Sequence, residues 1–273
     1  MKVFKFGGAS VKDAAGVKNL SSIVHQQQGQ LIVVVSAMGK TTNLLETLCN
    51  AYFHRDSKVP AIMKELKDFH LNIVTSLFPL NAPVYKHLEE LFINLENILA
   101  SESSLCYDYE YDRIICFGEL ISTTIISDYM EMEGIENQLI DIRKFLKTDQ
   151  NYRNANIDLE LSEQLCKEAF DFNTSSTFVT QGFIAGTRTN QTTTLGREGS
   201  DYTAALLANL LNAENVTIWK DVPGVMNAGV KTDRFYVLKD SYGNYYKLRF
   251  TKFGTGTDGT ERGRPEIEYA LLK

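Results

Sequence analysis

MKVFKFGGASVKDAAGVKNLSSIVHQQQGQLIVVV, residues 1–35, predicts two strands with a helix between them. The first strand, 3–6, ends at paired glycines. The second, 31–35, is a continuous apolar run rich in β-branched residues, which is typical of a strand buried on both faces. Residues 11–28 show the pattern of a helix. A strand, glycine turn, helix and strand in this order form a βαβ unit, which requires a parallel sheet.

The alternation of helices and strands continues beyond this unit. Residues 42–101 are predicted to be mainly helical, with a break at 81–83, and a further helix begins near Ile114 and carries 117–122. Strands are predicted at 139–142, 177–180 and 216–219, and helices at 159–172 and 202–211. This order predicts a doubly wound α/β fold.

The pattern changes after Ala228. Residues 235–238, 245–251 and 267–272 alternate in period two, and 240–244 supply a hairpin turn. A glycine- and threonine-rich loop, 254–263, follows. We therefore expect a β-rich tail, 229–273, that forms an antiparallel meander after a first domain, 1–228.

Composition excludes several classes of protein. The 273 residues carry a net charge of −6 with acids and bases interleaved, which argues against nucleic-acid binding, since that needs a concentrated basic face. No apolar run approaches the ~18–20 residues that span a bilayer, and the start is too short in apolar length for a signal peptide. The four cysteines are scattered, as in reduced cytoplasmic proteins, and the four histidines lack metal-ligand spacing. We expect a cytoplasmic protein with no membrane segment and no protein-bound metal site.

Two turns that leave the first strands could hold an anion. Gly7 and Gly8 would let backbone N–H groups approach a phosphate, and Lys5 lies at the carboxyl end of its strand, where parallel sheets bind ligands. An ordinary tight turn with a surface lysine remains an alternative. Residues 36–42 imitate the end of a P-loop, but Val34 stands where that motif requires glycine. A glycine- and hydroxyl-rich turn facing a phosphate is the interpretation that remains.

Two further segments contain candidate binding residues. Glu119 lies on an apolar helix, where a buried carboxylate would need a partner, so it is either a partner for a substrate ammonium group or an exposed residue. The polar, glycine-punctuated stretch 192–201 contains Arg197, which suits bidentate recognition of a carboxylate, and Ser200 or Asp201 would suit a helix N-cap. Residues 219–225 are either a nucleotide contact or an ordinary strand exit.

Six strings together resemble aspartate kinase, of the amino-acid kinase family. They are KFGGASV (5–11), SAMGKTTNLL (36–45), FGELIST (117–123), TQGFI (180–184), TTTLGREGSDYTAALL (192–207) and WKDVPGV (219–225). They follow the family's order across about four-fifths of the chain. The resemblance implies a three-layer amino-acid kinase-like fold with a mostly parallel sheet, incomplete at its C-terminal end.

The same resemblance implies an activity and a role for each matching residue. The activity is ATP-dependent phosphorylation of the L-aspartate β-carboxylate, with Mg²⁺ accompanying ATP, as a step of amino-acid and lysine biosynthesis. It assigns catalysis to Lys5 and Asp201, and substrate binding to Thr42, Glu119, Phe183 and Arg197. It assigns ATP binding to Lys5, Gly7, Gly8, Ser10, Ser36, Ser200, Lys220 and Asp221. A homodimer is the assembly that it suggests.

The chain also departs from the family. Ala9 replaces a threonine, Glu198 a glycine, and Met226 stands where tyrosine is frequent. After Ala228 the family's ATP-binding D-P-R and G-A-K segments and its ACT domains are absent, and the tail instead resembles the end of HmuY-like proteins. Three interpretations stay open: an active kinase without regulatory domains, an inactive amino-acid-binding protein, or a truncated or fused product.

Overall fold

The computed structural model describes residues 1–219, 236–239, 245–252 and 266–272. The chain divides into two compact units, Met1–Trp219 and Lys220–Lys273. The predicted domain boundary at 228 lies outside the described residues and stays a prediction.

A five-stranded parallel sheet forms the centre of the first unit. Its order is β3 (Gln138–Ile140), β5 (Thr177–Gln181), β2 (Leu31–Val35), β1 (Lys2–Phe6) and β8 (Asn215–Trp219). Every residue of β2 and β5 is buried. The predicted βαβ opening is thereby confirmed, with a short 3-10 helix, η1 (Gly8–Val11), preceding α1 (Ala14–His25).

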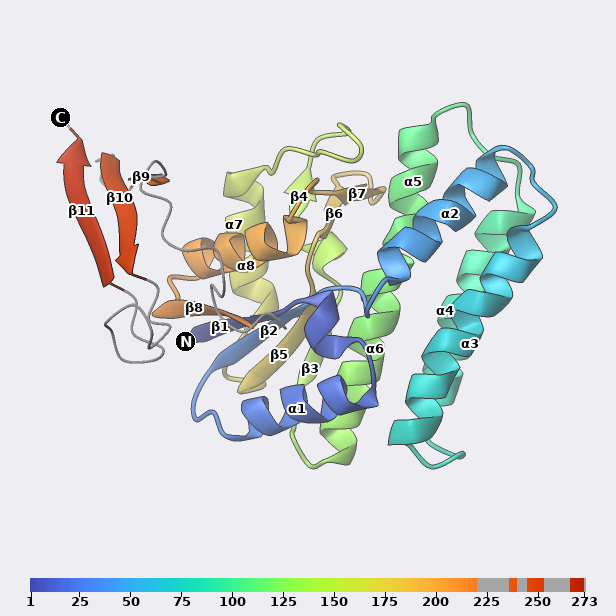
Figure 1. Cartoon of the computed structure of the whole chain (residues 1–273), viewed down its shortest axis with the longest axis horizontal. Helices are drawn as coiled ribbons and strands as arrows, with labels where there is room; N and C mark the ends of the chain where they lie inside the picture. The colour runs from blue at the N-terminus through green and yellow to red at the C-terminus, as the bar shows by residue number, and fades with distance from the viewer. Residues whose placement is uncertain (220–235, 240–244, 253–265, 273) are drawn as a thin grey trace. The chain divides into compact units, whose positions relative to one another are not determined.

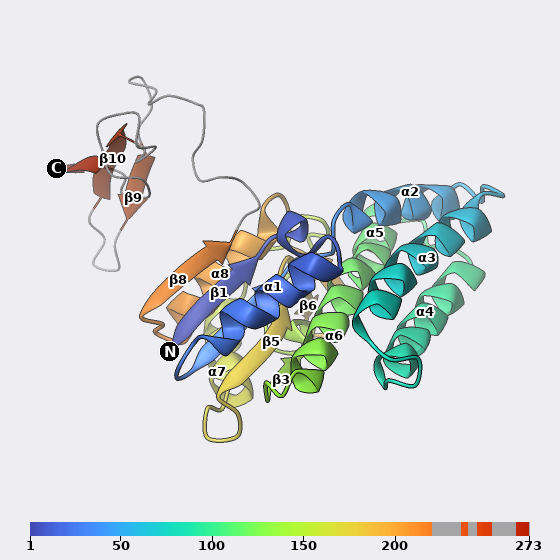
Figure 2. The same ribbon diagram turned by 60° about the horizontal axis from the view of Figure 1, so that its bottom comes forward.

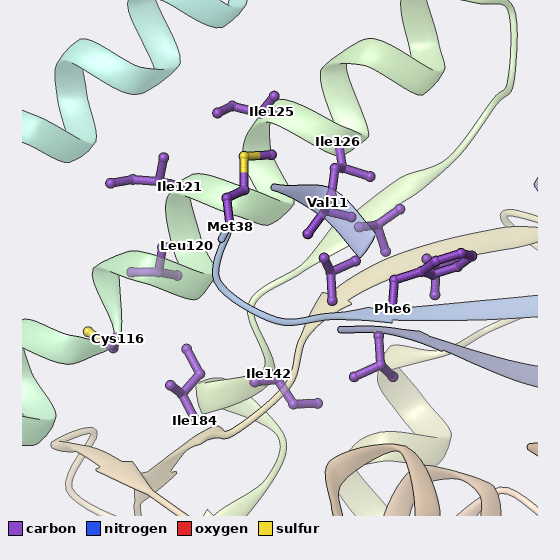
Figure 3. Packing of buried hydrophobic residues seen from close by; sticks show 14 of the residues in the cluster. Phe6, Val11, Met38, Cys116, Leu120, Ile121, Ile125, Ile126, Ile142 and Ile184 are labelled. Atoms are coloured by element: carbon purple, nitrogen blue, oxygen red, sulfur yellow. The ribbon is translucent and has the colours of Figure 1, made fainter. Parts of the chain in front are cut away.

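Helices cover both faces of this sheet, as Figure 1 shows. α1 and α6 (Phe117–Met132) lie on one side, and α7 (Leu159–Ala169) and α8 (Gly199–Leu210) lie on the other. This arrangement confirms the three-layer α/β fold. Figure 3 shows that the two turns that leave β1 and β2 share one apolar cluster with α6, formed by Phe6, Val11, Met38, Ile121, Ile125 and Ile126. Each such buried side chain contributes about 1.5–3 kcal/mol, so the turns are firmly anchored.

Four helices form a lobe at one end of this unit (Figure 2). They are α2 (Thr41–Phe53), α3 (Val59–Leu77), α4 (Val84–Ala100) and α5 (Tyr107–Ile115). The predicted helical region and its break at 81–83, which lies between α3 and α4, are confirmed. The helix predicted to begin near Ile114 is instead two helices, because α5 ends at Ile115 and α6 begins at Phe117. Cys116 between them keeps helical backbone angles, so the sequence pattern runs on without a break.

A small mixed sheet lies in segments for which the sequence predicted no strands. It consists of β4 (Lys147–Thr148), β6 (Ile184–Thr187) and β7 (Thr192–Thr194), in the order β4-β6-β7, and η2 (Ile142–Lys144) precedes it. Strands of two to four residues are too short to show a period, so the sequence gives no signal for them.

In the second unit the structure describes three strands, β9 (Tyr236–Lys239), β10 (Tyr245–Lys252) and β11 (Glu266–Leu272), in the order β11-β10-β9. Both pairs are antiparallel, with Tyr245 opposite Lys239 on one side and Leu272 on the other. The predicted meander is confirmed, while its turn, 240–244, and its loop, 254–263, lie outside the described residues. Among the helices that the structure describes, none is long and apolar enough to cross a bilayer.

Candidate functional site

The carboxyl ends of four parallel strands line up at one edge of the central sheet. Trp219, Phe6, Val35 and Gln181 lie in a single row of the register. The ladder continues one step further, because the N–H groups of Gly7, Ser36 and Gly182 donate to the carbonyls of Trp219, Phe6 and Val35 at 3.2, 3.1 and 2.9 Å. The turns that were predicted to bind ligands therefore begin at the same edge.

The first two turns are in direct contact. The N–H of Gly39 donates to the Gly8 carbonyl at 2.9 Å. A Cβ atom on Gly8 would lie only 2.5 Å from the carbonyl oxygen of Ala37, so no larger residue fits there. Ser10 lies in the same turn, and its hydroxyl donates to the Trp219 carbonyl at 3.3 Å. Thr42 is half-buried in the first turn of α2, which leaves this edge.

Lys5 and Asp201 form a largely buried ion pair. Their Nζ and Oδ1 atoms are 2.6 Å apart, and Lys5 is only 6% exposed. Asp201 lies in the first turn of α8. The suggested N-cap at Ser200 or Asp201 is wrong, because α8 begins at Gly199 and Glu198 occupies the cap position. The two residues that were predicted to be catalytic are thus in contact, and the surface-lysine alternative fails.

Glu119 is buried, and no cation of the part of the chain that the structure describes forms an ion pair with it. It is 2% exposed, its Oε1 accepts the N–H of Ala37 at 3.2 Å, and its Oε2 has no hydrogen-bond partner among the same residues. Burial raises the pKa of this carboxyl group to about 8, although the Ala37 N–H and the charge of Lys5 oppose that shift. The exposed alternative for Glu119 is therefore wrong. A buried carboxylate with one free oxygen is suited to an incoming cation.

A hydrogen-bond network holds α6 against the sheet edge. The Ser122 hydroxyl donates to the Ser36 carbonyl at 2.8 Å, and the Gln181 amide donates to the Thr123 hydroxyl at 2.8 Å. The Thr123 hydroxyl in turn donates to the Glu119 carbonyl at 2.8 Å. Sequence reasoning did not identify Ser122, Thr123 or Gln181 as part of the site, because each acts only through contacts with distant segments.

Phe183 and Ser200 lie where β5 ends beside α8. Phe183 is half-buried with a φ of +70°, and its N–H donates to the Thr203 hydroxyl at 3.0 Å. Ser200 is buried, and a Cβ atom on Gly182 would lie 2.5 Å from the Cβ of Ser200. This close approach fixes the start of α8 against the exit from β5.

Arg197 is exposed and precedes α8 by two residues. Asp201, the partner of Lys5, lies in the first turn of the same helix, so Lys5 and Arg197 both approach this helix end. Lys220 and Asp221 lie outside the described residues. A separate cavity of about 440 Å³ borders β4 and β6, and none of the predicted site residues lines it.

Comparison with known proteins gives a consistent result. The model of the amino acid kinase family matches residues 1–247. Lysine-sensitive aspartokinase 3 of Escherichia coli is 34% identical over 227 residues, which are 82% of this chain and 49% of that protein. The aspartokinase of Chlamydia trachomatis is 29% identical over 88% of this chain and 52% of its own length.

Solved structures agree with these relatives. E. coli aspartokinase III in complex with aspartate and ADP superposes with a TM-score of 0.73 at 30% identity, over 82% of this chain and 50% of that one. Its complex with lysine and aspartate gives a TM-score of 0.74 with the same coverage and identity. This chain thus spans about half the length of the aspartokinases that it matches.

Proposed function

This chain belongs to the amino acid kinase family, and we propose that it transfers the γ-phosphoryl group of ATP to the β-carboxylate of L-aspartate. The single observation that carries the proposal is Glu119, a buried carboxylate with a free oxygen, beside a lysine already paired with Asp201. An amino acid supplies the missing cation through its α-ammonium group. Arg197, with Thr42 and Phe183, would then hold the rest of the substrate.

Lys5 and the glycine turns are suited to the phosphates. Lys5 would neutralise charge on the transferred phosphoryl group while Asp201 fixes its position. Backbone and hydroxyl groups of Gly7, Gly8, Ser10, Ser36 and Ser200 would surround the remaining phosphates. A β-carboxylate is ionised at neutral pH, so no general base is needed, and alignment with charge stabilisation supplies most of the catalysis.

Magnesium and the nucleotide complete the proposal. Mg²⁺ usually binds through substrate phosphates with one or two carboxylates, so it would arrive with ATP. Within the described ranges, no cluster of three or more His, Cys, Asp or Glu side chains forms a protein site for it. We assign Lys220 and Asp221 to nucleotide contacts on the family resemblance alone.

The wider setting follows from the proposed reaction. Aspartyl phosphate is an activated acid, so its formation suits the first committed step of a biosynthetic route, such as that of lysine. We place the protein in the cytoplasm, in keeping with four free cysteines of which three are buried. A homodimer is the assembly that we propose for it.

A second candidate function is amino-acid binding without phosphoryl transfer. The observation that favours it is the sequence after Ala228, which lacks the family's lysine-bearing ATP-binding segments. Under this alternative Glu119 and Arg197 would bind aspartate, and ATP would bind weakly or fail to react.

The test combines calorimetry with an assay of ADP release. We expect wild-type protein to bind aspartate and to release ADP only when aspartate and Mg-ATP are both present. Glu119→Gln should weaken aspartate binding by about 10- to 100-fold and leave ATP binding unchanged, because a hydrogen bond to a charged group is lost. Glu131→Gln, an exposed change on the same helix, is the matched control. Binding of aspartate without ADP release would select the second candidate, and no binding of aspartate would refute both.

A further inference from the structure

A second buried acid lies close to the substrate-binding turn. Asp112, on α5, is 0% exposed, yet it belongs to none of the roles described above. Burial raises the pKa of its carboxyl group to about 6, opposed by the hydrogen bonds and the charge around it. At neutral pH it is therefore mainly ionised, and its hydrogen bonds are charge-assisted.

Asp112 joins two segments that are distant in the sequence. Its Oδ2 accepts the N–H of Thr194 and the N–H of Arg153, both at 2.9 Å. Its Oδ1 accepts the Thr194 hydroxyl at 2.7 Å. One carboxylate thus satisfies three donors, two of them from the end of β7.

The end of β7 leads directly into the Arg197 turn. Only Leu195 and Gly196 separate Thr194 from Arg197, and Gly196 has a φ of +74°. A Cβ atom on Gly196 would lie 2.6 Å from the Asn154 Oδ1, so the loop before Ala155 packs against this turn. The N–H of Ala155 also donates to the Thr194 carbonyl at 3.0 Å.

The loop before Ala155 is also held by the side chain of Arg153. The Arg153 guanidinium lies 4.3 Å from the ring centroid of Tyr111 and pairs with Asp108 at 3.2 Å, and both partners are on α5. Residues of α5 therefore bind Arg153 of this loop both at its backbone N–H and at its guanidinium group. α5 also packs against α2, whose first turn carries Thr42.

We propose that Asp112 is a positioning residue, which holds the turn that carries Arg197 in the geometry needed to bind the substrate carboxylate. The inference rests on the proposed function for its substrate, while the order of the turn itself can be measured without any ligand. The Asp112 carboxylate holds the backbone of Thr194 and Arg153 through its hydrogen bonds. Because only two residues separate Thr194 from Arg197, the position of Thr194 restricts where the Arg197 backbone can lie.

The experiment compares two buried acids of the same helix. Glu110 is also 0% exposed, but it pairs with Arg113 and accepts the Ser104 N–H, away from β7. Asp112→Ala and Glu110→Ala should both lower the melting temperature. Only Asp112→Ala should speed amide hydrogen exchange in residues 195–199. Thr194→Val, which removes one of the three donors, gives a milder test if Asp112→Ala folds poorly.

Kinetics supply the second measurement. Asp112→Ala should raise KM for aspartate by about 10-fold or more, with little change in KM for ATP, because small displacements of a binding group are costly. Asp112→Asn, which keeps one acceptor oxygen, should recover part of that loss. Glu110→Ala should leave KM for aspartate unchanged.

The outcomes separate this inference from the proposed function. Unchanged exchange in 195–199 in both Asp112→Ala and Thr194→Val would overturn the inference, as would equal changes in Asp112→Ala and Glu110→Ala. Faster exchange confined to the Asp112 and Thr194 variants would support it. If wild-type protein fails to bind aspartate while this exchange pattern holds, the proposed function fails and the positioning of the turn stands.

Discussion

Two carboxylates lie near Lys5 at the same edge of the sheet, and they differ in what neutralises them. Asp201 is 2.6 Å from the lysine Nζ and keeps a partly exposed side chain. Glu119 is buried, feels the lysine only at longer range and leaves Oε2 without a partner. The Asp201 carboxylate is thus paired with the lysine, whereas the Glu119 Oε2 has no hydrogen-bond partner among the described residues and can accept one from the proposed substrate.

Among the variants that test this difference between Asp201 and Glu119, Lys5→Ala should have the largest effect on activity. It removes the charge that the transferred phosphoryl group needs, so kcat should fall by about 100-fold or more. It also removes the cation that lies 2.6 Å from the partly exposed Asp201, so the unfolding free energy should fall by about 1–3 kcal/mol. Steady-state ADP release and chemical unfolding measure the two effects.

A double variant separates catalysis from folding. Lys5→Met with Asp201→Asn removes both charges, so most of the stability should return while turnover stays low. If the double variant regains turnover, Lys5 does not stabilise the transferred group. If Lys5→Ala alone keeps its stability, the ion pair contributes nothing measurable to the fold.

Local patterns predicted the central sheet well. The run 31–35 became β2 because a β-branched apolar stretch has few alternatives to a buried strand. The same logic predicted β5 and β8 to within one or two residues. The described parts of the six strings also meet near one edge of the sheet, since the carboxyl ends of parallel strands share one side.

Burial of acids could not be predicted from the sequence. Glu119 is enclosed by a contact with Ala37, 82 residues away, and Asp112 by contacts with Thr194, also 82 residues away. The stretch YDYEYD, 107–112, alternates acids with tyrosines and resembles a solvated face. Two of those acids, Glu110 and Asp112, are nevertheless buried, and Asp112 is enclosed by its contacts with Thr194 at the end of β7. The N-cap of α8 was missed for a similar reason, since Glu198 uses backbone geometry and no side-chain bond there.

The pH dependence of stability tests whether Glu119 is protonated in the fold. Its carboxyl pKa is about 8 in the folded chain and 4.5 as the ordinary value. Below pH 4.5 the Glu119 carboxyl group is protonated in both the folded and the unfolded chain, so burying it costs no work of protonation and the folded chain has its full stability from this group. As pH rises toward 8 the unfolded chain ionises first, and that contribution is lost.

Glu119→Gln removes this titration. The variant should therefore gain stability relative to wild type as pH rises from 5 to 8, by about 3–4 kcal/mol. Urea unfolding at pH 5, 6.5 and 8 measures the difference. A difference between the two proteins that stays constant across this range would show that Glu119 is already ionised in the folded chain.

The smallest effect concerns a third acid, Glu198, which lies next to Arg197 and differs from the other two in being exposed. Its φ of +57° lies in the left-handed region, where a side chain costs about 1–2 kcal/mol. Glu198→Gly should remove that strain and, after the added freedom of the unfolded chain, raise the unfolding free energy by about 0.5–1 kcal/mol. Glu198→Ala keeps the Cβ atom and removes the charge, so it should not stabilise the fold. If both variants tighten aspartate binding equally, the charge of Glu198 weakens the Arg197 side of the site; if only the glycine variant does so, the backbone is responsible.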